Sequence, residues 1–293
     1  MSSEKWTVAD VPDQTGRTVM VTGGTSGIGK EAARVLAGRG AHVVLPSITR
    51  AEGEAAAADI GGSTEVHELD LASFDGIRAF ADSYDGEIDV LLDNAGLMSK
   101  TLKRTRDDVE LHWGVNFLGP YLLTALLLPR IRERVVITAS MAHAKGEIDL
   151  DDTDLARRGY DMGAAYANSK LACMLWGLGL QERLQEAGST VDVQLAHPGF
   201  ALTTILEITP WQRVNDVLKR LGGPVVPSAV DGARPLLYAA TRELPPVSYV
   251  GPTGPFQVGG TPGPCSRAPR AEDPAVARRL LEYADAVTGL TGA

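Results

Sequence analysis

The stretch "RTVMVTGGTSGIGKEAARVLAGRG", residues 17–40, joins a strand pattern, a glycine-rich turn and a helix pattern without interruption. Its first part, residues 17–23, is an apolar run that ends in glycine and predicts a strand buried on both faces. Residues 30–40 have helical periodicity and close on two glycines. A buried strand that leads directly into a helix predicts a parallel β-sheet whose strands are connected by helices.

The turn between them, Thr22–Gly29, has the features of a phosphate-binding loop. Gly23 permits a tight turn, Gly27 lets the backbone approach a phosphate, and Gly29 lets the helix pack closely on the strand. The opening helix offers unpaired N–H groups and the positive end of its dipole to a pyrophosphate. A glycine-rich turn alone is weak evidence, but this one follows a strand and precedes a helix, as the interpretation requires.

The alternation of apolar runs and helical patterns continues along the chain. Further strands are expected at 41–45, 65–69, 88–96, 133–140, 191–197 and 255–259, and helices at about 50–59, 73–84, 107–129, 163–187 and 273–289. The Pro- and Gly-rich segment 245–274 is expected to be mostly irregular. We therefore expect an α/β fold: a Rossmann-type doubly wound parallel sheet of about seven strands, with helices on both faces, formed by residues 1–293 as one domain.

The composition excludes several classes of function. Hydrophobic residues make up 44% and charged residues 22%, as in globular proteins, and the net charge of −9 argues against nucleic acid or an anionic membrane surface as a partner. The N-terminus has no signal-peptide pattern, and two cysteines are too few for a disulfide framework, so we expect a cytoplasmic protein. The five histidines have no metal-ligand spacing, and the aspartates at 149–154 lack the glycine and glutamate of a calcium loop, so no metal site is expected.

Short motifs follow the glycine loop in a fixed order. They are "DNAG" (93–96), "GVNFLGPYLLT" (114–124), "VVITAS" (135–140), "YANSK" (166–170) and "HPG" (197–199). With "TGGTSGIG", they resemble the motifs of the short-chain dehydrogenase/reductase family; "SMAH" (140–143) and the long segment before Tyr166 resemble its retinol-dehydrogenase-like and protochlorophyllide-reductase-like branch. Asp93 replaces the asparagine more usual in that family. The resemblance implies an NAD(P)-dependent oxidoreductase that transfers a hydride between a nicotinamide and an alcohol or carbonyl carbon.

The same resemblance assigns Asn116, Ser140, Tyr166 and Lys170 to the catalytic site. Tyrosine is a weak base at neutral pH, but a lysine one helical turn away favours the phenolate, so this pair suits general acid/base catalysis. Ser140 is expected to hydrogen-bond the substrate oxygen, ahead of Thr138, which strand alternation places on the same side but deeper. Asn116 is expected to hold a relay water, and it can also bond to the backbone as an ordinary helix residue.

The family pattern also gives the expected cofactor contacts, with Asp70 near the adenine ring and the loop from Pro198 near the nicotinamide. They are Gly23, Thr25, Ser26, Gly27, Ile28, Gly29, Ser47, Thr49, Arg50, Asp70, Leu71, Asn94, Ala95, Gly96, Tyr166, Lys170, Pro198, Gly199 and Thr203. Residues 46–50 contain no acid to bind a ribose 2′-hydroxyl, whereas Ser47, Thr49 and Arg50 can hold a 2′-phosphate. NADP(H) is therefore expected; related sequences often have an arginine near Ile48, so NAD remains an alternative.

The resemblance places a substrate lid at about 200–223, and apolar residues there favour an apolar or aromatic small-molecule substrate, although they can equally serve to pack the lid. The apolar run Leu171–Leu180 offers more surface than one sheet face needs, which predicts a homodimer or homotetramer. Two other functions stay open: another reaction on the same fold, such as C=C reduction or epimerisation, and a catalytically silent dinucleotide sensor.

Overall fold

The order of strands in the sheet places the glycine loop at its centre. The computed structural model describes residues 5–199 and 228–290, and its sheet has eight strands in the order β3-β2-β1-β4-β5-β6-β7-β8. These are β1 Thr18–Val21, β2 His42–Ser47, β3 Ser63–Glu68, β4 Ile88–Asp93, β5 Ile131–Thr138, β6 Asp192–Ala196, β7 Tyr249–Pro252 and β8 Pro262–Pro264. All pairs are parallel except β7–β8. The chain order reverses at β1, which lies between β2 and β4, and in such sheets a ligand crevice opens at this point.

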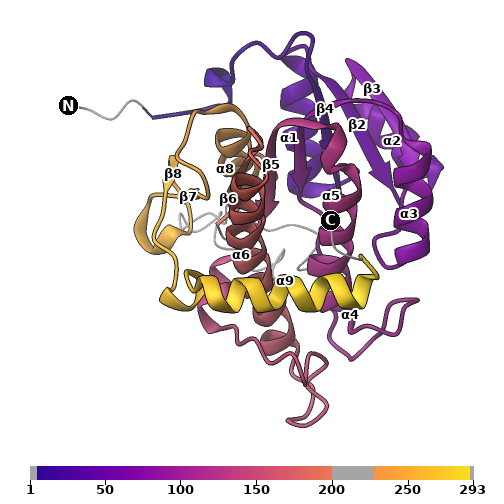
Figure 1. Ribbon diagram of the computed structural model, residues 1–293. Helices are drawn as coiled ribbons and strands as arrows, with labels where there is room; N and C mark the ends of the chain where they lie inside the picture. Colours follow the sequence, from indigo (N-terminus) through magenta and orange to yellow (C-terminus); the bar gives the residue numbers. More distant parts are fainter. Residues whose placement is uncertain (1–4, 200–227, 291–293) are drawn as a thin grey trace, which may run out of the picture.

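Helices cover both faces of this sheet (Figure 1). They are α1 Gly27–Gly38, α2 Arg50–Ile60, α3 Phe74–Ser83, α4 Leu111–Trp113, α5 Gly119–Leu127, α6 Met162–Glu186, α8 Ala229–Thr241 and α9 Pro274–Thr288. Short helical turns are η1 Val8–Asp10, η2 Gly114–Leu118, η3 Leu128–Arg130, η4 Met141–Lys145, η6 Pro255–Gln257 and η7 Pro269–Ala271. One apolar core lies between the sheet and α1, α2 and α8, and the other between the sheet and α3, α5 and α6. The doubly wound α/β fold predicted from the sequence is thus confirmed.

The strand expected at 255–259 is wrong. Pro255–Gln257 form η6, in which Phe256 and Gln257 both have φ of 55°. The residues between β7 and β8 form a turn closed by hydrogen bonds from Thr253 N to Thr261 O (2.9 Å) and from Gly254 N to Gly259 O (2.9 Å). The segment 245–274 therefore contains two short strands that its Pro and Gly content concealed.

The helix expected at 107–129 begins at Leu111 instead. Thr105 Oγ1 accepts hydrogen bonds from the backbone of Asp107 and Val109, and such local bonds compete with a helix. The Glu110 side chain then caps the helix by accepting from Trp113 N at 2.8 Å. The segment 111–130 is long and apolar enough to cross a membrane, but 78% of its most apolar window is buried within the fold.

Helix α9 lies across α6 and beside α5 (Figure 1). It begins with Asp273 as N-cap and Pro274 in its first turn, and Gly289 follows its end in the left-handed conformation. Its buried residues are Ala277, Leu280, Leu281, Ala284 and Thr288. Part of the apolar surface on α6 that led to the expectation of an oligomer is therefore covered within the same chain.

The packing of α9 on α6 predicts a large loss of stability in Leu281→Ala. Leu281 is 1% exposed and packs beside Gly179 of α6, so truncation leaves a cavity and should lower the free energy of unfolding by about 2–5 kcal/mol. Arg279→Ala, on the exposed side of the same helix, is the matched control and should change it by less than about 0.5 kcal/mol. Urea-induced unfolding measures both values. Equal stability of the two variants would show that α9 is not part of the folded core.

Candidate functional site

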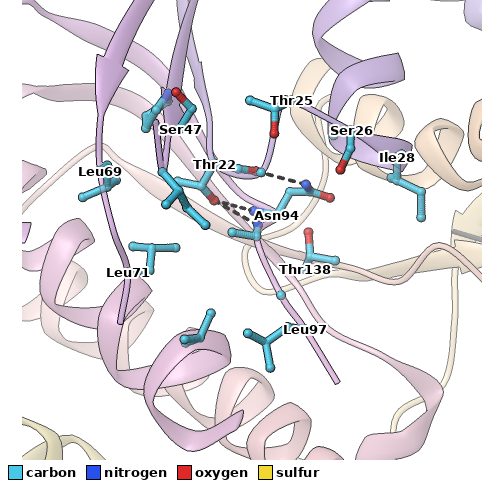
Figure 2. A pocket seen from close by; sticks show the side chains of 18 of the residues that line it. Thr22, Thr25, Ser26, Ile28, Ser47, Leu69, Leu71, Asn94, Leu97 and Thr138 are labelled. Atoms are coloured by element: carbon cyan, nitrogen blue, oxygen red, sulfur yellow. Dashed lines mark hydrogen bonds between the residues drawn. The ribbon is translucent and has the colours of Figure 1, made fainter. Parts of the chain in front are cut away.

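The glycine loop and the end of β4 are in direct contact (Figure 2). Thr22 Oγ1 accepts hydrogen bonds from Asn94 N and Ala95 N, each at 3.0 Å, and Asn94 Nδ2 donates to Thr22 O at 3.0 Å. A Cβ atom on Gly29 would lie 2.3 Å from Asn94 Nδ2 and 2.4 Å from Gly23 O. Only glycine fits at position 29, because any side chain would push α1 away from the end of β4.

The first turn of α1 is suited to an anion. Ser26 precedes the helix as its N-cap residue, but its side chain makes no capping hydrogen bond. The backbone N–H groups of the first turn therefore stay available, and they carry the positive end of the helix dipole. This arrangement fits the pyrophosphate of a dinucleotide, as the sequence predicted.

A hollow of about 340 Å³ runs from this loop towards Tyr166. Most of the expected cofactor contacts line it: Gly23, Thr25, Ser26, Gly27, Ile28, Gly29, Ser47, Asp70, Leu71, Asn94, Ala95, Gly96, Tyr166, Lys170 and Pro198. Thr49, Arg50, Asn116, Ser140 and Gly199 are described by the structure but do not line it. Thr203 and the expected lid at 200–223 lie outside the described residues.

Several lining residues were not predicted from the sequence. They are Thr22, Pro46, Ile48, Glu52, Leu69, Ala72, Leu97, Leu111, Val115, Thr138 and Ala139. Thr138 Oγ1 is buried and makes no hydrogen bond within the described chain, and its side chain faces the hollow (Figure 2). Strand alternation predicted Thr138 on the same side as Ser140 but deeper, and Thr138 is indeed buried whereas Ser140 is half-buried.

The rim beyond β2 shows how the expected phosphate-binding residues are used. Ser47 is 5% exposed and donates from Oγ to Thr49 O at 2.8 Å, and Thr49 caps α2 by accepting from Glu52 N. The Arg50 side chain is 62% exposed, with its guanidinium 3.8 Å from Glu54. The exposed Arg50 guanidinium can turn towards an anion, but the N–H groups of Arg50 and Glu52 at the start of α2 already donate to Glu68 and Thr49. Glu52, which lines the hollow, opposes an anion.

Lys170 lies deep in the site, with 4% of its surface exposed. Its Nζ donates to Thr138 O at 2.8 Å and lies 5.9 Å from the centre of the Tyr166 ring. No carboxylate of the described residues forms an ion pair with it. A buried ammonium held by a carbonyl oxygen is costly, and such groups are concentrated at functional sites.

Asn116 lies in η2, where the helix widens to a π-turn. Its Oδ1 accepts from Leu97 N at 2.8 Å, and its Nδ2 donates to Leu97 O and Ser169 Oγ, each at 3.1 Å. The side chain therefore joins the segment after β4 to α6, which was the structural alternative considered for it. It also lies close to Lys170, because a Cβ on Gly96 would touch both residues.

Ser140 and two histidines stabilise the loops beside the site. Ser140 Oγ accepts from Ala142 N at 3.2 Å, and His143 Nδ1 donates to Ser140 O at 2.7 Å. His143 Nε2 accepts from Ala268 N, so both ring nitrogens are used and the ring is neutral. Burial lowers the pKa of His143. Burial also lowers the pKa of His197, to about 4, and the Nδ1 atom of His197 accepts a hydrogen bond from Gly199 N. Both histidines thus have positions that explain them without a catalytic role.

Asp93 is buried at the end of β4, directly before Asn94. Its Oδ2 accepts from Thr124 Oγ1 at 2.7 Å, and its Oδ1 has no hydrogen-bond partner in the described chain. Burial raises the pKa of Asp93 to about 7, and the hydrogen bond from Thr124 opposes this only in part. The residue that departs from the family motif is therefore a carboxyl group that is neutral in mild acid.

Comparisons with known proteins agree with this geometry. The family described as short chain dehydrogenase matches residues 17–212. Human (Homo sapiens) retinol dehydrogenase 13 is 39% identical over 292 residues, covering 94% of this chain and 85% of that protein. Polyprenol dehydrogenase of Danio rerio is 36% identical over 256 residues, covering 81% and 78%. The crystal structure of an uncharacterized protein from Mycobacterium Paratuberculosis superposes with a TM-score of 0.85 at 40% identity, covering 98% of both chains.

The burial of Asp93 predicts a pH-dependent stability. The folded chain binds a proton at Asp93 up to about pH 7, whereas an unfolded aspartate releases it near pH 4. The free energy of unfolding should therefore fall as pH rises from about 4 to about 7, by up to a few kcal/mol, and level off above about 7. In Asp93→Asn this part of the slope should be absent, as measured by urea-induced unfolding across that range.

Asp82→Asn, an exposed carboxylate on α3, is the control for that experiment and should keep the wild-type slope. The same slope in wild type and Asp93→Asn would show that Asp93 is ionised in the folded state throughout the range.

Proposed function

The chain belongs to the short-chain dehydrogenase family, and from this premise we propose that it interconverts an alcohol and a carbonyl group on an apolar small molecule with NADP(H). Family membership makes it an NAD(P)-dependent oxidoreductase. The observation that carries the finer proposal is the pair Tyr166 and buried Lys170 at the inner end of a hollow that begins at a dinucleotide loop. NADP(H), when bound, supplies or accepts the hydride.

The residues around Tyr166 have distinct proposed roles. The Tyr166 hydroxyl makes no hydrogen bond within the described chain, so it is available to pass a proton to or from the substrate oxygen. Lys170 places a positive charge beside the Tyr166 ring and binds the cofactor. Ser140 stabilises charge on the substrate oxygen, with Thr138 as the competing hydroxyl. Asn116 holds the segment at Leu97 against α6.

Two observations support an apolar substrate. The hollow is lined near Tyr166 by Leu97, Leu111 and Val115. The relatives carry the names retinol dehydrogenase and polyprenol dehydrogenase, which denote long apolar alcohols. An apolar site rewards the burial of such substrates at about 25 cal/mol per Å² of apolar surface. Assembly as a homodimer or homotetramer and a cytoplasmic location stay predictions, and light scattering tests the first.

The proposed roles of Tyr166 and Lys170 predict different failures. Tyr166→Phe removes the transferable proton but keeps the ring, so turnover of retinal or another apolar aldehyde should fall by about 10²–10⁴-fold with nearly unchanged NADPH affinity. Lys170→Met removes the positive charge as well as a cofactor contact, so both turnover and NADPH affinity should fall. Tyr238→Phe, a half-buried tyrosine on α8, is the control and should leave both intact. Steady-state kinetics and fluorescence titration measure the two quantities. Substantial turnover in Tyr166→Phe would mean that another group transfers the proton.

The cofactor preference can be tested at Ile48, which is 70% exposed and lines the hollow. NADPH should bind more tightly than NADH to the unmodified protein. Ile48→Asp should reverse the preference, because a carboxylate repels the 2′-phosphate and accepts from the ribose hydroxyls; a change of about 1.4 kcal/mol is tenfold in the ratio of dissociation constants. Ile48→Arg is the matched opposite and should favour NADPH further. Tighter binding of NADH than of NADPH to the unmodified protein would show that the Glu52 carboxylate, and not Arg50, determines the cofactor preference.

A further inference from the structure

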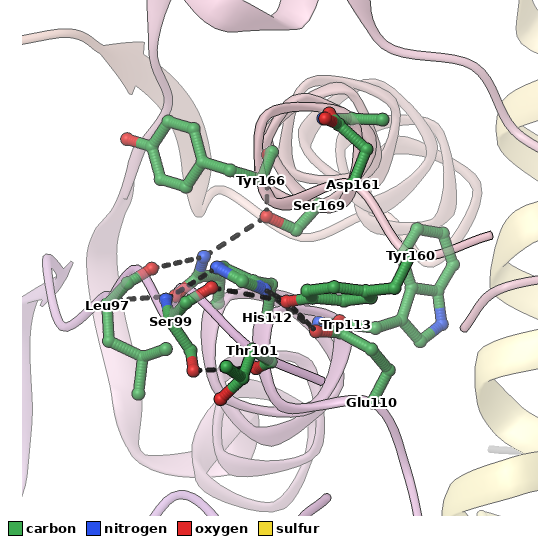
Figure 3. A network of polar contacts seen from close by, with 12 residues as sticks. Leu97, Ser99, Thr101, Glu110, His112, Trp113, Tyr160, Asp161, Tyr166 and Ser169 are labelled. Carbon is green, nitrogen blue, oxygen red and sulfur yellow. Dashed lines mark hydrogen bonds and ion pairs between the residues drawn. The ribbon is translucent and has the colours of Figure 1, made fainter. Parts of the chain in front are cut away.

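A buried polar cluster lies behind Tyr166 and is not used in the proposed chemistry (Figure 3). It consists of Ser99, Glu110, His112 and Tyr160, here called the Glu110 cluster. Glu110 is 2% exposed and His112 is fully buried. Charged and titratable groups are seldom buried to this extent unless they are paired, so the cluster needs an explanation beyond solvation.

The hydrogen bonds of His112 fix its protonation state. Ser99 N lies 2.9 Å from His112 Nε2, and because a backbone N–H can only donate, Nε2 has no proton. Nδ1 therefore carries the proton and donates it to Glu110 Oε1 at 2.7 Å. Glu110 Oε2 accepts from Trp113 N, the helix-capping bond described above. One carboxylate thus fixes both the ring of His112 and the start of α4.

Tyr160 closes the cluster from a different part of the chain. It belongs to the segment between η4 and α6, which extends away from the helices (Figure 1). Its hydroxyl lies 3.3 Å from Ser99 O and 3.4 Å from Glu110 Oε1, and its ring stacks on His112. Burial and the Glu110 carboxylate raise the pKa of Tyr160 to about 12, so this hydroxyl is a donor at neutral pH.

An ion pair joins the same two segments nearer the surface. Arg104 Nη2 lies 2.6 Å from Asp154 Oδ2, and Arg104 also donates from Nη1 to Asp108 O. An exposed ion pair contributes little to stability, so the half-buried Tyr160, which contacts the buried Glu110 and His112, is the more important of the two attachments.

The cluster contacts the active site at two points. The His112 ring packs edge-on against the Tyr166 ring, with centroids 6.3 Å apart and planes at 74°. The segment after β4 is bonded by Asn116 at Leu97 and by His112 at Ser99, and Leu97 lines the hollow. A shift of the cluster would therefore move both a wall of the hollow and the tyrosine ring.

We propose that Glu110, His112 and Tyr160 are positioning residues that hold the segment Leu97–Lys103 as a fixed wall beside Tyr166 and so orient the substrate. This inference rests on the proposed function for its effect on turnover, but the fixed wall itself is a property of the fold. The segment between η4 and α6 then has a role in the site through Tyr160, although it is otherwise rich in acidic residues and only partly buried. The positions of reacting groups matter steeply, since a misplacement of 1 Å can cost about 10²-fold in rate.

Tyr160→Phe tests the proposal with little risk to folding, because it keeps the stacked ring and removes only the hydroxyl. Hydrogen–deuterium exchange followed by mass spectrometry should show faster exchange in the peptide that covers 97–103. Turnover of retinal with NADPH should fall about tenfold, while the NADPH dissociation constant and the midpoint of thermal unfolding stay unchanged. His112→Gln keeps an acceptor for Ser99 N but loses the bond to Glu110, and it should show a larger effect of the same kind.

Tyr238→Phe is again the matched control and should leave exchange and turnover at wild-type values. Unchanged exchange at 97–103 in Tyr160→Phe would overturn the proposal, as would faster exchange without any fall in turnover. An equal weakening of NADPH binding would also overturn it, because the cluster would then support the whole fold. If the wild type turned over no substrate, the proposed function would fail, while the exchange measurement would still decide whether the cluster holds the wall.

Discussion

The contact between the glycine loop and Asn94 is the constraint on which the rest of the site depends. Gly29 leaves no room for a side chain, and three hydrogen bonds join Thr22 at the end of β1 to the residues after β4, two from Asn94 and one from Ala95. This contact holds the open first turn of α1 over the point where the strand order reverses. The same end of β4 continues into Leu97, so the phosphate-binding turn and the proposed wall of the substrate site share one rigid support.

The buried ammonium of Lys170 is the main constraint at the other end of the hollow. Burying this charge against a carbonyl oxygen costs free energy, and the packing of the buried residues of α6 must offset that cost. Two groups of polar contacts lie near Lys170: Asn116 bonds Leu97 and Ser169, and His112 of the Glu110 cluster bonds Ser99. In the proposed function, this arrangement would hold the charge of Lys170 in place before any ligand binds, as electrostatic catalysis requires.

Most of the fold and much of the site could be predicted from the sequence, because those features depend on local patterns. Apolar runs predicted β1, β2, β4, β5 and β6, whereas the mostly polar β3 was predicted from its place between two helical patterns. The glycine loop and the Tyr166–Lys170 pair could be predicted because each has a spacing with a physical reason. The strands β7 and β8 could not be predicted, since they are short, rich in Pro and Gly, and defined by their pairing with β6 and with each other. The Glu110 cluster was also missed, because Glu110 and His112 meet Tyr160 only when two distant loops dock.

In the proposed function, a hydride passes from NADPH to the carbonyl carbon of an apolar substrate. The most direct measurement is a single turnover with retinal and NADPH that carries deuterium at the transferable position of the nicotinamide, followed by mass spectrometry of the product. We expect an alcohol with one deuterium on the carbon that bears the hydroxyl. Deuterium on a carbon of a former double bond, or a product without deuterium, would contradict the account.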